Sequence, residues 1–150
     1  MNGSLHDYSP REIAMNVKFT VDPVIEQNSI FIKNMALSTL FLKNDKENPW
    51  FILVPRKHGA IELVDLNHEE QSILMEEVTI VSEFLKSHYR PHKLNFGSLG
   101  NIVQQLHFHV IARYPTDRAW PGPIWGSPTT QEFDAIEIEN LKSNFFEFIE

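Results

Sequence analysis

The chain has 150 residues, of which 42% are hydrophobic and 22% are charged, and its formal net charge is −7. This composition is typical of one globular domain, and the acidic balance argues against binding to long nucleic acids, which depends on Lys and Arg neutralising phosphates. The absence of cysteine excludes disulfide frameworks and thiolate metal sites, and the lack of a membrane-spanning run or an export signal leads us to expect a cytoplasmic protein with no membrane contact.

The first half of the chain predicts a short helical turn and three strands. Residues 1–14 are polar and aperiodic, so we predict a flexible extension there and a single domain over residues 15–150. Asp22-Pro23 to Gln27 is typical of a helical turn. Residues 29–34 and 38–44 are rich in β-favouring side chains and predict a hairpin. Residues 50–54 predict a buried strand that Pro55 ends.

The second half predicts a long helix, two strands and a last helix. Asn67 and Glu70 form a capping-box pattern ahead of a helix that reaches about His88. Residues 93–98 and 106–114 predict strands on either side of a glycine-containing loop, residues 120–126 are too rich in Pro and Gly for regular structure, and the apolar spacing from Ile138 to Phe148 predicts a helix. The fold class is therefore α+β, with an antiparallel sheet of about five strands and helices on one side.

Residues 105–111, Gln-Leu-His-Phe-His-Val-Ile, alternate polar and apolar side chains. Successive strand residues point to opposite faces, so Gln105, His107 and His109 would share one face. Histidine near neutral pH is able to act as a nucleophile or as a proton donor. The pattern predicts an active site on this strand.

The order of a strand ending in Val-Pro-Arg-Lys-His at residues 54–58, a long helix, Asn95, a glycine loop and the His-x-His strand resembles the histidine triad (HIT) family of nucleotide hydrolases and transferases. The family motif is His-φ-His-φ-His-φ-φ, with φ apolar, and residues 105–111 match it at every position except the first. The resemblance extends over about residues 19–126. Residues 119–126 look like the tail of a bacterial branch that carries Gln at the first motif position.

The resemblance implies a HIT-like fold, a homodimer, no cofactor or metal, and a small nucleotide as substrate. His107 takes the position of the histidine that attacks the α-phosphorus and forms a nucleotidyl-histidine, His109 that of a donor to phosphate oxygens, and Gln105 that of the first motif histidine. The resemblance assigns nucleotide binding to six other residues: Asn44 and Asp45 at the ribose, Asn95 and Asn101 at the phosphates, and Phe31 and Leu42 at the base. The substrate would be a dinucleoside polyphosphate or a nucleoside phosphoramidate.

Three positions depart from the family pattern, and two other functions stay open. Gln105 replaces a histidine, Trp50 stands where many members have a histidine, and Ile102 stands where they have a hydroxyl residue. The departures at Gln105 and Trp50 favour, as an alternative, a nucleotide-binding module with little or no turnover. The other alternative is a zinc site in which His58 or Asp45 joins the two motif histidines.

Overall fold

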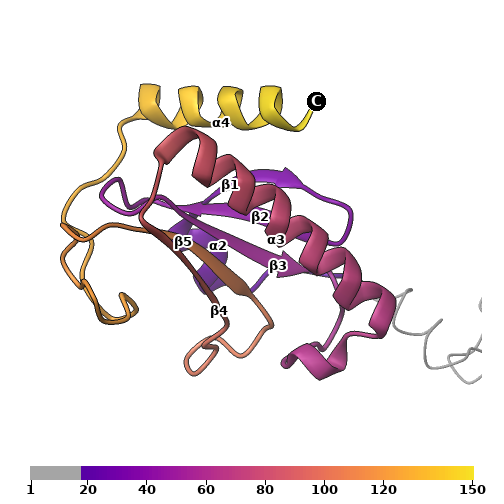
Figure 1. Cartoon of the computed structure of the whole chain (residues 1–150). Coiled ribbons are helices and arrows are strands. Elements are labelled where there is room, and N and C mark those ends of the chain that lie inside the picture. Colours follow the sequence, from indigo (N-terminus) through magenta and orange to yellow (C-terminus); the bar gives the residue numbers. More distant parts are fainter. Residues whose placement is uncertain (1–17) are drawn as a thin grey trace, which may run out of the picture.

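The computed structural model describes residues 18–150, so the predicted extension and the first residues of the predicted domain lie outside the described part. Five strands form one sheet in the order β1-β2-β3-β5-β4, and every neighbouring pair is antiparallel (Figure 1). The strands are β1 (Ser29–Asn34), β2 (Ser38–Lys43), β3 (Trp50–Pro55), β4 (Lys93–Gly97) and β5 (Phe108–Arg113). With the helices described next, this confirms the predicted α+β class.

The helices lie on both faces of the sheet, and not on one side as the sequence predicts. Helices α3 (His68–Tyr89) and α4 (Ala135–Ile149) cover one face, α2 (Pro23–Asn28) lies on the other, and a 3-10 turn, η2 (Leu63–Asp65), precedes α3 (Figure 1). The prediction differs because the short α2 packs on the face opposite α3 and α4. The larger core lies beneath α3 and α4. Within residues 18–150, no helix combines the length and the apolar character that crossing a membrane requires.

Helix α3 begins where the sequence predicts. The Asn67 side chain accepts from the Glu70 amide, and the Glu70 carboxylate accepts from the Asn67 amide, which completes the capping box. Leu74, Val81 and Leu85 are buried against the sheet. The amphipathic face of the helix therefore fixes one layer of the sandwich.

Strand register decides which side chains share the face opposite α3. His109 pairs with Ile52 on β3 and with Gly97 on β4, and Ile52 pairs with Phe41 on β2. Directly opposed residues point to the same side of a sheet. This face carries a second, smaller apolar cluster, with Ile25 of α2 and Ile124 of the later loop packed over it.

The histidine strand is shorter than predicted, because β5 begins at Phe108 and not at residue 106. Its partner strand β3 ends at Pro55, which has no amide hydrogen to donate. The chain then turns through Gly59, whose φ is +76°, and the Leu106 amide donates to the Ala60 carbonyl. This single bond ties Leu106 to the segment after the turn, while Leu106, Phe108 and Val110 still enter the larger core as the alternation predicts.

Candidate active site

His107 and His109 lie side by side on the face opposite α3. Their ring centroids are 5.0 Å apart, with the planes at 72°. Each residue is only 8% exposed. Two imidazoles fixed this close on a strand and its entry form a compact pair, and each ring has a specific partner on its Nδ1 atom.

The partner of His107 is a backbone carbonyl. His107 Nδ1 lies 2.7 Å from the carbonyl oxygen of Gln105. A carbonyl only accepts hydrogen bonds, so Nδ1 must carry the proton and donate. In the neutral ring, Nε2 then has a free lone pair, and no hydrogen bond engages Nε2 within residues 18–150. His107 is therefore held in the tautomer that a nucleophile requires.

The partner of His109 is an indole. Trp50 Nε1 donates to His109 Nδ1 at 2.7 Å. An indole N–H only donates, so His109 Nδ1 must accept and Nε2 carries the hydrogen. Burial lowers the pKa of His109 to about 3, and the nearby His107 and Lys43 act in the same direction. His109 is a neutral side chain that offers an N–H from Nε2.

A cavity of about 220 Å³ opens beside His109. Its walls come from α2, the start of β1, β2, β3, β5 and the loop after β5: Val24, Ile25, Asn28, Ser29, Lys43, Trp50, Ile52, His109, Trp125 and Gly126. The Lys43 ammonium lies 4.0 Å from the centre of the Trp50 ring, and burial lowers its pKa, with Asp45 opposing the shift. The cavity is thus mostly apolar, with one cation among its described lining residues.

Gln105 uses both ends of its amide to hold the segment before α2. Its Nε2 donates to the Thr20 carbonyl at 2.8 Å, and its Oε1 accepts from the Asp22 amide at 2.7 Å. These two bonds lie on one stretch of backbone, so the side chain acts as a clip between that stretch and the histidine strand. The resemblance gives Gln105 the first motif position, and in the structure both polar atoms of its amide are bonded to this backbone.

Four of the predicted nucleotide-binding residues are committed to internal contacts. Leu42 is fully buried in the core beneath α3, on the face opposite the histidines. Asn44 Oδ1 accepts from the Phe133 amide, Asp45 pairs with Arg118 at 2.7 Å, and Asn95 Oδ1 accepts from Arg113. The structure does not bring these side chains into the cavity beside His109, because each already has a partner or faces the other core.

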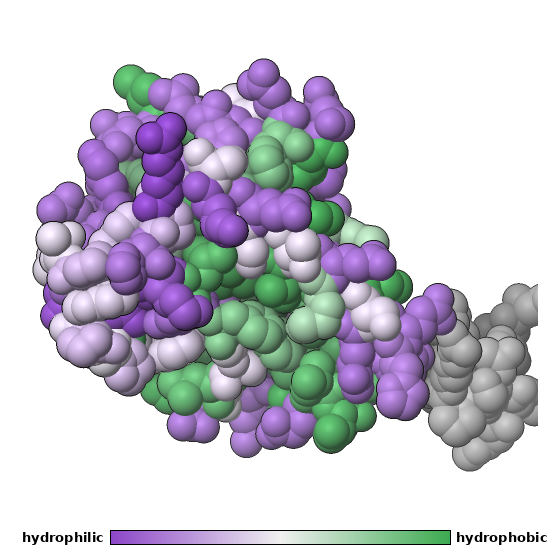
Figure 2. Space-filling view, viewed as in Figure 1, coloured by the Kyte–Doolittle hydropathy of each residue, from purple (hydrophilic) through white to green (hydrophobic). Residues whose placement is uncertain are grey.

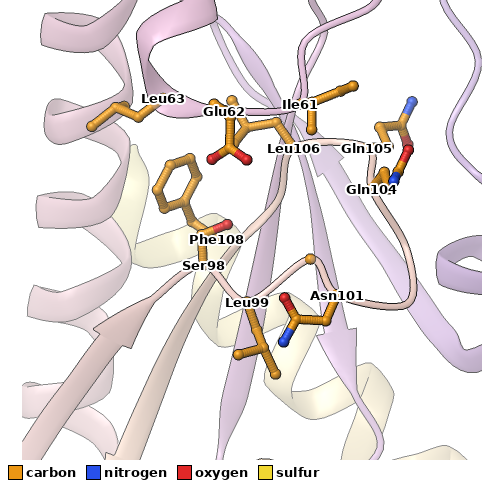
Figure 3. A pocket seen from close by; sticks show the side chains of 11 residues that line it. Ile61, Glu62, Leu63, Ser98, Leu99, Asn101, Gln104, Gln105, Leu106 and Phe108 are labelled. Carbon is orange, nitrogen blue, oxygen red and sulfur yellow. The ribbon is translucent and has the colours of Figure 1, made fainter.

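Phe31 and Asn101 are the predicted binding residues that remain open. Phe31 is 51% exposed and packs edge-on against Phe41, on the histidine face. Asn101 is exposed in the loop after β4 and lines a second cavity of about 160 Å³. Figure 3 shows this cavity between Ile61, Glu62 and Leu63 of the η2 segment and Ser98, Leu99 and Asn101 of the loop.

The zinc alternative finds no third ligand. Within residues 18–150, no three His, Asp or Glu side chains lie close enough together to hold a metal ion. His58 is exposed in its turn, and Asp45 is buried against Arg118. The sequence suggested that His58 or Asp45 would lie near the two motif histidines. In the described residues, neither joins them in a group that could hold a metal ion.

Sequence reasoning missed Lys43 and the α2 residues that line the cavity, and it gave Trp125 no definite place. Lys43 shares a face with Trp50 by strand pairing, and a register prediction for β2 and β3 would have found it. Trp125 contacts the rings of Trp50 and His109 edge-on, with centroids 6.2 Å and 5.6 Å away. It reaches them through an irregular loop, for which the sequence carries no periodic signal.

The HIT domain model matches residues 24–116. A crystal structure of a histidine triad protein from Bradyrhizobium japonicum is 38% identical, with a TM-score of 0.83 over 88% of this chain and 98% of that chain. A histidine triad (HIT) protein from Sinorhizobium meliloti 1021 is 38% identical, with a TM-score of 0.82 over 86% and 96%. A histidine triad protein from Marinobacter aquaeolei VT8 is 33% identical, with a TM-score of 0.82 over 87% and 95%. The curated proteins include no match.

Proposed function

The chain belongs to the HIT family, and we propose that it is a nucleotide phosphohydrolase or transferase that acts at the α-phosphorus through a nucleotidyl-histidine on His107. The observation that carries this proposal is the bond from His107 Nδ1 to the Gln105 carbonyl. It leaves the Nε2 lone pair of a neutral imidazole free, as covalent catalysis by histidine requires.

His109 supports the same reaction as a donor. With Nδ1 accepting from Trp50, its Nε2–H is available to a phosphate oxygen. A fixed N–H in a buried site stabilises charge that develops on phosphate oxygens in the transition state. The neighbouring cavity, with Lys43 on its wall, offers apolar contact and a positive charge to a nucleotide. Its volume is below the about 300 Å³ of a typical ligand pocket, so the nucleotide would extend beyond it.

The test is to trap the intermediate. Full-length protein, in molar excess, is mixed with a nucleotide substrate that is labelled at the α-phosphorus. The reaction is quenched within one turnover and the protein is digested. We expect the label on the peptide that contains His107, stable to alkali and labile to acid. His107→Asn should carry no label and should show no turnover, with an unchanged circular dichroism spectrum. Wild-type activity in that variant would contradict covalent catalysis at His107.

A second candidate is a nucleotide-binding module with little turnover. The observation that favours it is the clip formed by Gln105, which commits the first motif position to the backbone at Thr20 and Asp22. Calorimetry with nucleoside monophosphates separates the two candidates. The result that would favour the module is binding in the calorimeter together with no label transfer and no product release when enzyme and substrate are mixed at equal concentrations.

We also propose that the protein is a homodimer that pairs through β4. Strand β4 is an edge of the sheet, and Phe96 and Leu99 are 44% and 54% exposed there. Figure 2 shows apolar patches, with hydrophilic surface between them, on the lower side of the molecule. An open edge with apolar side chains is a template for pairing with another strand, and a second copy supplies the same edge by two-fold symmetry.

A further inference from the structure

We propose that this site selects substrates whose leaving group departs as a weakly basic phosphate oxyanion, and discriminates against nucleoside phosphoramidates, whose amine needs a proton. The inference rests on the proposed function and narrows its substrate class to phosphoanhydrides. Trp50 is the positioning residue behind the selection, because it acts through His109.

The bond from Trp50 to His109 prevents His109 from becoming an acid. To donate a proton and remain neutral, His109 would first have to carry hydrogens on both nitrogens. Its Nδ1 already accepts from the indole at 2.7 Å, and a proton there would face the indole hydrogen. Trp50 is 1% exposed and packs edge-on against Trp125, so its surroundings hold the indole in this position. His109 keeps its N–H as a hydrogen-bond donor and does not give it up.

The other positions of the motif offer no proton either. The Gln105 amide has no titrating proton, and both its polar atoms are bonded to backbone. Ile102 has no hydroxyl, and its side chain is 93% exposed in the loop. The departures of this chain from the family pattern therefore act in one direction: each removes a proton donor from the site and keeps the nucleophile.

Lys43 favours the same class of leaving group. His107 and Lys43 are the titratable groups whose charges act on His109. The facing residues of the other elements, Ile52 and Gly97 across the strands and Trp125 in the loop, carry no charge. The Lys43 ammonium lies over the Trp50 ring and lines the cavity beside His109. Its positive charge attracts a departing phosphate and repels an ammonium.

The chemical step balances without an acid only for an oxyanion. The lone pair of His107 Nε2 forms a bond to the α-phosphorus, and the bond from phosphorus to the leaving oxygen breaks with its electron pair on that oxygen. Water then attacks phosphorus, the P–N bond breaks with its pair returning to Nε2, and one water proton goes to solvent. A phosphate has a second pKa of about 6, so it is stable as the anion. An alkylamine, with a conjugate-acid pKa of about 10, must be protonated as its bond to phosphorus breaks.

The experiment compares two probes that share one nucleoside 5′-phosphoryl group, a dinucleoside polyphosphate and an alkyl phosphoramidate, with monophosphate release measured by chromatography. General-acid catalysis contributes about 10²–10⁴-fold, so kcat/KM for the anhydride should exceed that for the phosphoramidate by at least about 10². Equal values, or a preference for the phosphoramidate, would overturn this inference and leave the labelling of His107 intact. No turnover of either probe and no label would contradict the proposed function as well.

Three variants and one spectrum isolate Trp50. Trp50→His supplies a ring that can accept from His109, so the preference for the anhydride should shrink. Trp50→Phe removes the N–H and should shrink the preference in the same direction, whereas Trp125→Phe keeps an aromatic ring against Trp50 and His109, leaves the Trp50 N–H in place and serves as the packing control. If neither Trp50 variant narrows the preference, or if Trp125→Phe narrows it as much, the role of Trp50 is refuted. In the wild type, ¹⁵N chemical shifts should show His109 with an unprotonated Nδ1 across the active pH range. A doubly protonated His109 in that range would by itself refute the claim that the Trp50 bond keeps Nδ1 unprotonated.

Discussion

Each motif histidine is oriented by a single Nδ1 partner, and the two partners have opposite hydrogen-bonding character. The Gln105 carbonyl accepts and the Trp50 indole donates, so the rings of His107 and His109 are held in opposite tautomers. One ring presents a lone pair and the other presents an N–H. These two contacts place the proposed nucleophile beside the proposed donor.

Arg113 and Asp117 form a buried ion pair. The Arg113 guanidinium donates to Asp117 at 2.9 Å from Nε, and the side chains are 1% and 0% exposed. Asn48 also donates to Asp117, as does the Tyr114 amide. Burial alone would raise the pKa of the Asp117 carboxyl, but these hydrogen bonds outweigh it and the pKa is lowered.

Asp117→Asn should destabilise the protein by about 3–5 kcal/mol near neutral pH, because it leaves the Arg113 charge buried and unpaired. A carboxyl with a lowered native pKa stabilises fully above its unfolded value of 3.8, and the contribution is lost as the pH falls below it. Urea unfolding at about pH 7 and about pH 3 should show the difference between variant and wild type shrinking in acid. Glu139→Gln, at an exposed ion pair with Lys142, is the control, with an expected loss below about 1 kcal/mol. A loss that does not change with pH would exclude the ionised pair as its source.

Helix α3 is attached to the β1–β2 turn by a buried carboxylate. Glu77 is 2% exposed and accepts from the amides of Leu37 and Ser38 at 2.7 Å and 3.1 Å. Burial raises its pKa above the ordinary value, although these amides and Arg56 oppose the shift. The turn would otherwise leave two amides without acceptors, so a charged residue in an apolar stripe is the anchor of this layer.

Glu77→Ala should lower the free energy of unfolding by about 2–4 kcal/mol, since each orphaned amide costs about 1–3 kcal/mol. Glu77→Gln should lose less, because its carbonyl still accepts. A raised native pKa means that wild-type stability declines as the pH rises from 4.5 towards the native value, and Glu77→Gln should lack this decline. Denaturant unfolding across that pH range measures it, with Glu76→Ala, at an exposed neighbour, as control. Equal pH profiles for wild type and Gln would argue against titration of Glu77.

For the helices and strands, the sequence predicted which elements form, but it predicted their ends and their contacts poorly. Caps and periodicity predicted α3, α4 and all five strands, because these signals are local. The start of β5 depended on a bond from Leu106 to Ala60, which is a tertiary contact. The pairing of Trp50 with His109 joins positions 59 residues apart. The alternation of polar and apolar residues predicted that the histidines share one face. It did not indicate that the Trp50 indole would donate to His109.

For the whole molecule, the open edge at β4 predicts the assembly. The Phe96 ring stacks on Phe108 at 5.4 Å yet remains 44% exposed. Phe96→Asp places a charge on each copy at the proposed two-fold contact, and like charges facing each other there are unfavourable. Light scattering after size exclusion should change from the mass of two chains to that of one. The control is Ile136→Asp, at an exposed apolar residue on α4. A monomeric wild type, or a dimer that survives Phe96→Asp, would rule out this interface.

The pairing of β3 with β5 has a consequence for how the chain reaches its native state. Strands β1, β2 and β3 are consecutive hairpin partners, and so are β4 and β5, whereas β3 meets β5 only after the long excursion through α3. Contacts between distant parts of a chain form slowly compared with local ones. The Trp50–His109 bond lies across this late junction. A half-folded chain with both hairpins intact would carry His109 on its strand and still leave the tautomer of that ring unfixed, so the proposed catalytic competence should appear only with the last pairing of the sheet.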